Sequence, residues 1–128
     1  MTELDITPKL PAGRNLIQGY GGGQFRVGGK ILHGSQIVFP ERTVPWSVNV
    51  SQDVALDSLL EVTAAPDAVR ILLVGCGRHF NPPPKTLGES LRGYNILLEW
   101  MDTGAACRTF NVLVLEDREV AAALIAVD

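Results

Sequence analysis

The side chains best suited to chemistry in this sequence are two cysteines, one acid and two arginines. Cys76 and Arg78 share a glycine-rich turn, Asp102 precedes Cys107 by five positions, and Arg118 follows in an acidic turn. A cysteine becomes a nucleophile when a base or a helix N-terminus lowers its pKa, and an arginine can hold a carboxylate. These residue types would suit a small cleft that binds a ligand or supports nucleophilic chemistry.

The elements that must position these side chains are two short apolar runs. Residues 71–77 and 96–103 are each bounded by turn residues, which indicates buried strands. Between them, Thr86 and Glu89 match a capping box, and Gly93 is suited to a left-handed helix exit. A right-handed β-α-β unit would bring both strand exits to one sheet edge. The candidate ligand cleft at that edge comprises Gly75, Cys76, Gly77, Arg78, Asp102, Thr103, Cys107 and Arg118.

Each polar residue of this cleft also has a structural interpretation. A helix is predicted from Thr103 to Leu115, and its apolar stripe includes Cys107 and Phe110, so a buried thiol is the alternative to a reactive one. Asp102 could cap that helix instead of lining a cleft. Arg118 could form an ion pair with a neighbouring acid instead of holding an anion.

The helix that begins at Thr103 also carries apolar residues away from its core-facing stripe. Val112 and Leu115 project near Arg108 and Asn111. A further layer of the fold could cover them, or they could form an exposed patch that binds a partner. Arg108, Asn111, Val112 and Leu115 are therefore the candidate partner surface.

The rest of the chain predicts one domain over residues 16–128, after an arm over residues 1–15 that could be flexible. A hairpin is expected at 24–27 and 30–32, after a flexible glycine approach at 19–24. Further strands at 35–40 and 44–49 would complete an N-terminal antiparallel meander, a helix is expected over 54–63, and 120–127 would form the last strand. The fold class is α/β, with a mixed sheet, this meander and one β-α-β unit.

Composition excludes several classes of function. The 128 residues carry a net charge of −3 and 46% hydrophobic residues, which fits a globular protein without a nucleic-acid footprint. No apolar run is long enough to span a bilayer, and the N-terminus lacks signal-peptide features, so a cytoplasmic location is expected. The glycines match neither a dinucleotide fingerprint nor a phosphate loop, and no metal-ligand spacing is present. We therefore expect no cofactor, no metal and no direct membrane insertion.

Several short motifs together resemble a small family of domains of unknown function. That family includes the mitochondrial assembly factor three for respiratory complex I and an adipogenesis-associated protein. The likeness extends over roughly residues 18–126 in the same order. It is carried by Gly34-Ser35, Pro45-Trp46, and residues 71–77, 99–103, 106–113, 116–118 and 120–125.

The resemblance implies a three-layer β/β/α fold and no established enzymatic activity, and in the mitochondrial branch a role in assembling a membrane-bound enzyme through protein contacts. The family's strand exit matches Gly75 and Gly77, its acid-threonine turn matches Asp102 and Thr103, and its helix motif matches 106–111. Cys76 replaces the usual threonine, and a mitochondrial presequence is missing, so a bacterial relative is expected.

Three hypotheses follow. The first is a non-enzymatic protein that resembles respiratory complex I assembly factors and binds another protein. The second is an enzyme or small-ligand binder that uses the strand-end cleft near Cys76, Asp102 and Arg118. The third is a purely structural homo-oligomer.

Overall fold

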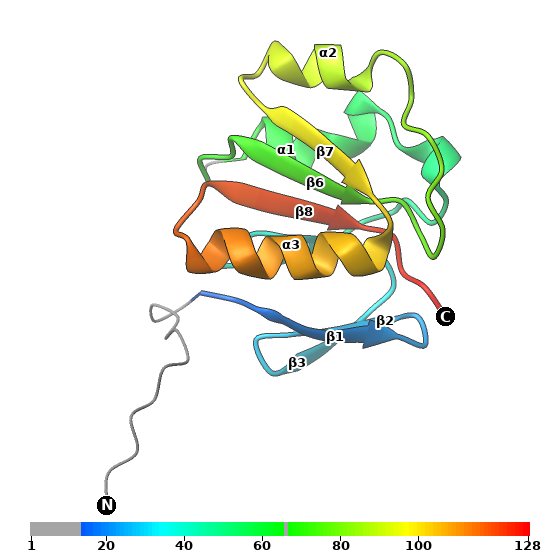
Figure 1. Ribbon diagram of the computed structural model, residues 1–128, viewed down its shortest axis with the longest axis vertical. Coiled ribbons are helices and arrows are strands. Elements are labelled where there is room, and N and C mark those ends of the chain that lie inside the picture. Colours follow the sequence, from blue (N-terminus) through cyan, green and yellow to red (C-terminus); the bar gives the residue numbers. More distant parts are fainter. Residues whose placement is uncertain (1–13, 66) are drawn as a thin grey trace, which may run out of the picture.

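The computed structural model describes residues 14–65 and 67–128, which form an antiparallel sheet and a mixed sheet (Figure 1). Sheet A has the order β1-β2-β3, with β1 (Ile17–Gly21), β2 (Gln24–Val27) and β3 (Lys30–His33). Sheet B has the order β5-β4-β8-β6-β7, with β4 (Gln36–Val38), β5 (Thr43–Pro45), β6 (Ile71–Gly75), β7 (Leu97–Met101) and β8 (Val120–Leu124). The helical segments are η1 (Ser51–Asp53), η2 (Leu56–Leu59), α1 (Leu60–Thr63), α2 (Leu87–Arg92) and α3 (Thr103–Leu115).

Two crossovers organise sheet B. β6 passes through α2 to its parallel neighbour β7, as predicted, and β7 then passes through α3 to β8 on the far side of β6. The two crossovers move across the sheet in opposite directions. Because such connections are right-handed, their helices must lie on opposite faces of the sheet. Leu91 of α2 and Phe110 of α3 accordingly belong to different core clusters.

These two clusters define three layers. One cluster fills the space between sheet B and the layer of η2, α1 and α2, with Leu59, Val62 and Leu91 at its centre. The other lies on the opposite face, where α3 and sheet A together cover sheet B through Phe110 and Phe25. Figure 1 shows α3 between sheet A and the strands β8, β6 and β7. The predicted three-layer α/β fold with a mixed sheet is confirmed.

Sheet A corrects one sequence prediction and confirms another. Residues 17–21 form strand β1 instead of a flexible approach, because Tyr20 pairs with Phe25 across the ladder despite the adjacent glycines. The hairpin around Gly28 and Gly29 is confirmed, and both glycines have positive φ, as a primed turn requires.

Strands β4 and β5 lie in sheet B, not in the N-terminal meander. Gly34, with φ of 77°, turns the chain out of sheet A. β4 then pairs antiparallel with β8, placing Ile37 in one core cluster and Val38 in the other. A strand with both faces buried belongs inside a covered sheet, which the short apolar run alone did not reveal. Residues 1–13 of the predicted arm lie outside the described residues. In the described part of the arm, the Asn15 backbone N–H donates to the Pro40 carbonyl.

The helix predicted over 54–63 is broken into short turns. The Ser58 hydroxyl donates to the Ala55 carbonyl at 2.7 Å and accepts from the Ala55 N–H at 3.1 Å. The Trp46 indole N–H donates to the Ser58 carbonyl at 2.8 Å. In a continuous helix, this carbonyl would accept a hydrogen bond from a backbone N–H of the next turn. Local side-chain bonds of this kind compete with helical bonding.

The capping box predicted for α2 is absent. Thr86 has φ of −100° and ψ of −3° and makes no side-chain cap, because the turn into the helix already begins at Pro84. Gly93 has φ of −61°, so it is not the left-handed exit either. Asn95, with φ of 60°, supplies the left-handed residue before β7. The final strand is also shorter than predicted, because β8 ends at Leu124.

Asn111 of α3 fixes sheet A to the rest of the fold. Its Oδ1 accepts from the Ile17 N–H and its Nδ2 donates to the Ile17 carbonyl, both at 2.8 Å. The side-chain amide thus acts as a strand partner at the outer edge of β1. Nearby, a side chain at Gly104 would collide with the hydroxyl of Tyr20, so the end of this side chain of β1 packs against α3 at that glycine.

We expect Asn111→Leu to lower the free energy of unfolding by about 1–3 kcal/mol, because both backbone groups of Ile17 lose their partner. Urea unfolding followed by circular dichroism measures this change. Val112→Ala, an exposed change on the same helix, is the matched control and should stay within about 0.5 kcal/mol. Equal effects of the two substitutions would contradict the role of the Asn111 clamp.

Candidate functional site

The two strand exits meet at one sheet edge, as the sequence predicts. The Gly77 N–H donates to Thr103 Oγ1 at 3.0 Å, and the Thr103 N–H donates back to the Gly77 carbonyl at 2.9 Å. In α/β sheets, ligands commonly bind in the crevice outside the carboxyl ends of such strands. This edge is therefore the first place to examine for a site.

The crevice between the strand exits is closed by the protein itself. Thr103 is fully buried, and its hydroxyl donates to the Ile125 carbonyl at 2.8 Å. A Cβ at Gly75 would lie 2.8 Å from the Thr103 Cα, so the two backbones are in direct contact. Gly75 and Thr103 thus join β6, α3 and the segment after β8, and they leave no space for a ligand between them.

Asp102 has the capping role that was the alternative to ligand binding. Its Oδ1 accepts from the Ala105 N–H at 2.9 Å at the start of α3. A carboxylate at this position also interacts favourably with the helix dipole.

Cys107 faces the core and not a cleft. Its side chain lies in the same cluster as Phe110, and burial raises its pKa from 9.0 to about 12. The charge of Asp102 raises this pKa further, whereas that of Arg108 opposes the shift. Although the thiol lies near a helix N-terminus, it is therefore held in its protonated and unreactive form.

Cys76 is bonded within the loop that follows β6. Its Sγ donates to the His79 carbonyl at 3.5 Å and accepts from the Asn81 N–H at 3.4 Å. Cys76, Gly77 and Arg78 line an open pocket of about 330 Å³, whose other walls come from residues 49–52 and 125–128. The strand-exit wall belongs to the cleft predicted from the sequence, whereas the other two walls come from distant segments without a shared motif and were not predicted.

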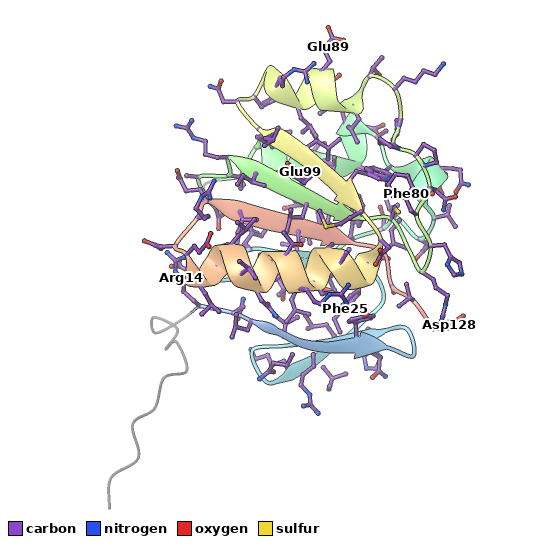
Figure 2. All side chains as sticks on the ribbon, viewed as in Figure 1. Arg14, Phe25, Phe80, Glu89, Glu99 and Asp128 are labelled. Atoms are coloured by element: carbon purple, nitrogen blue, oxygen red, sulfur yellow. The ribbon has the colours of Figure 1, made fainter. Side chains whose placement is uncertain are left out.

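Arg118 does not belong to the predicted cleft. It precedes β8, which runs parallel to β6, whereas Gly77 follows β6. Arg118 therefore lies at the opposite end of the strands from Gly77. There it borders a second pocket of about 350 Å³ with Arg14 and Asp67. Figure 2 shows the two ends, with Arg14 at one and Phe80 and Asp128 at the other. The ion-pair alternative fits better, because Arg118 Nη1 lies 4.0 Å from Glu116 Oε1.

The candidate partner surface is divided by the structure. Val112 and Leu115 are exposed by 54% and 38%, and Arg108 is also exposed. Asn111 instead holds β1 and is only partly accessible. The fold does not cover the two apolar side chains, so the sequence-based alternative of a covering layer is wrong for them.

Two further observations concern metals and membranes. In residues 14–65 and 67–128, no three side chains of histidine, cysteine or acidic type are grouped so that they could hold a metal ion. Within the same ranges, no helix combines the length and apolar character needed to cross a membrane. The expected lack of a cofactor stays a prediction.

We expect Thr103→Val to lower the free energy of unfolding by about 1–3 kcal/mol, because the Gly77 N–H and the Ile125 carbonyl each lose a partner at a buried position. Thr109→Val is the matched control, since within the described residues the Thr109 hydroxyl has a single hydrogen bond, to the Met101 sulfur at 3.6 Å, in a partly buried place. Denaturant titration compares the two variants. A Thr103→Val protein as stable as the control would show that the junction does not depend on this hydroxyl.

We expect native Cys107 to react with iodoacetamide at least about 100-fold more slowly than in urea, because its thiol is buried and protonated. A Cys76→Ala background isolates the reaction.

Stability should also fall as the pH rises from about 9 toward 12, because the unfolded thiol, with its ordinary pKa of 9.0, releases a proton that the folded thiol keeps. Cys107→Ala should remove this part of the pH dependence. Rapid alkylation of the native protein would contradict the structural role.

The chain is similar to several known proteins. A family model described as "Protein of unknown function (DUF498/DUF598)" matches residues 17–125. An uncharacterised protein of Rhodobacter capsulatus is 34% identical over 122 residues, which cover 94% of this chain and 93% of that protein. The Drosophila melanogaster NADH dehydrogenase (ubiquinone) 1 alpha subcomplex assembly factor 3 is 35% identical over 113 residues, which are 86% of this chain but 58% of that protein.

The fold is shared with solved structures as well. The crystal structure of an outer membrane protein from Bartonella henselae has a TM-score of 0.79 and 36% sequence identity, and the match covers 91% of this chain and 98% of that chain. The resemblance noted in the sequence is therefore confirmed over nearly all the described residues. The chain belongs to the DUF498/DUF598 family.

Proposed function

We propose that this protein is not an enzyme and acts by binding another protein, as its relatives named assembly factor 3 suggest. The state of its reactive groups supports the proposal. Thr103 and Asp102 are used in backbone contacts, and Cys107 is buried and protonated. A catalytic centre needs such groups free to meet a substrate.

The observation that carries the proposal is the exposed outer face of α3. Val112 follows Arg108 by four residues and Leu115 follows Val112 by three, so the three side chains are neighbours on the helix surface. Single exposed apolar residues are common, but two adjacent ones beside an arginine have the composition of an interface core. We name Arg108, Val112 and Leu115 the α3 surface.

The α3 surface is well placed to bind without rearrangement. Its helix is capped by Asp102 at one end, joined to the strand exits through Thr103, and linked to β1 by Asn111. A helix held at several points loses little conformational entropy on association, which favours affinity.

The proposal also covers the cellular location of the protein and the kind of molecule that it binds. We place the protein in the cytoplasm, as expected from the composition of the chain. We also place its partner among other proteins, with a second copy of this chain as the rival occupant. The name of the Bartonella henselae relative, an outer membrane protein, makes cell fractionation the measurement that decides the location.

We expect Leu115→Asp to abolish partner binding while the domain stays folded, because the charge falls on an exposed position of the α3 surface. The test is affinity capture from a native lysate of the source cells with mass spectrometry, and circular dichroism of each bait. Leu60→Asp is the matched control, because Leu60 is 60% exposed on another layer of the fold.

The proposal requires a stoichiometric protein that is captured by the wild type and by Leu60→Asp and is lost with Leu115→Asp. Equal capture by both variants would place the partner site elsewhere. Unfolding of Leu115→Asp would mean that this residue supports the core. Native mass spectrometry that finds a retained metabolite and no protein would favour the small-ligand alternative.

A further inference from the structure

The outer edge of β7 is an unpaired strand edge. β7 is the last strand of sheet B and pairs with β6 alone among the described residues. The Leu97 N–H donates to the Arg70 carbonyl and the Met101 carbonyl accepts from the Cys76 N–H, both at 2.8 Å, so these residues face β6. Successive residues of a strand alternate in direction. The backbone groups of Leu98 and Trp100 therefore point away from the sheet.

The other edge strands carry features that hinder strand pairing. β5 has three residues and ends in Pro45, and β3 begins with Lys30. The outer edge of β1 is occupied by the side-chain amide of Asn111. Short strands, prolines, lysines and covering elements are the usual devices that prevent unwanted strand pairing. β7 has five residues and no proline or lysine, so its own sequence carries none of these devices, although α2 packs beside it (Figure 1).

The side chains beside this edge define what could pair with it. On the α3 side of the sheet, Leu97 is 52% exposed and Glu99 is also exposed, as Figure 2 shows for Glu99 on β7. Glu99 takes part in no ion pair within the described part of the chain. An added strand would therefore place an apolar residue beside Leu97 and a basic residue beside Glu99.

We infer that β7 accepts an extended segment of a different protein by strand addition, and that a lysine or arginine of this segment pairs with Glu99. A second copy of this chain fits less well, because full antiparallel pairing of two β7 strands would bring Glu99 opposite its own copy. Strand addition supplies affinity through main-chain hydrogen bonds and specificity through alternate side chains. This inference rests on the proposed protein-binding function and assigns it a second surface, distinct from the α3 surface.

The test uses two synthetic peptides, acetyl-Thr-Leu-Thr-Lys-Thr-Leu-Thr-amide and the same peptide with glutamate in place of lysine. Each is titrated into nitrogen-15-labelled protein, and amide shifts and hydrogen exchange are recorded by NMR. The lysine peptide should shift β7 amides and slow exchange at Leu98 and Trp100 by at least about ten-fold at saturation. It should bind about five-fold more tightly than the glutamate peptide.

Glu99→Lys should reverse this preference, because the exposed charge changes sign without loss of a buried contact. Leu115→Asp should leave peptide binding at β7 unchanged, so failure of the α3 surface and failure of the β7 edge are distinguishable. The inference is overturned if millimolar lysine peptide shifts no β7 amide, or if the shifts lie on α3. It is also overturned if light scattering shows a dimer in which Leu98 and Trp100 are already protected.

Discussion

The structure depends most on the contacts of Thr103 at the junction of β6, β7 and α3. Its hydroxyl accepts from the Gly77 N–H and donates to the Ile125 carbonyl, and its backbone N–H donates to the Gly77 carbonyl. Three segments that are distant in sequence are thus joined at one buried residue. The contact requires glycine at position 75, because a Cβ there would lie 2.8 Å from the Thr103 Cα. Buried polar groups that satisfy one another in this way fix a single arrangement of the core.

This junction also directs where function can lie. In many α/β proteins the carboxyl ends of parallel strands form a ligand crevice at the point where the connections pass to opposite faces. Here β6 and β7 send α2 and α3 to opposite faces, yet Thr103 fills the space between their ends. Chemistry at that point would require opening the core. Two exposed surfaces outside this point are the outer face of α3 and the edge of β7.

Helix α3 serves both sheets, and its exposed face follows from that double role. Phe110 and Val114 pack on sheet B, while Asn111 and Gly104 approach β1. With these two directions occupied, the remaining surface of the helix is open to solvent. Val112 is on that open side. Its exposed side chain does not belong to the core and is therefore free to contact a partner.

The sequence by itself determined the elements whose signals are local. The runs before Gly75 and Met101 predicted β6 and β7, the pair Gly28-Gly29 predicted its hairpin, and Asp102 marked the start of α3. In each of these, apolar period, turn chemistry and capping agree within a few residues. The right-handed crossover rule then placed two of the candidate site segments at one edge.

Tertiary structure decided the features that depend on distant partners. The Trp46 indole and the Ser58 hydroxyl broke a helix that its apolar stripe favoured. Pairing with Phe25 made a strand of the glycine-rich residues around Tyr20. Strand direction put Arg118 at the opposite end of the strands from Gly77, because β8 runs parallel to β6 and not antiparallel to it. Local periodicity carries no information on which strands become neighbours, so the closure of the crevice by Thr103 was set only when the chain folded.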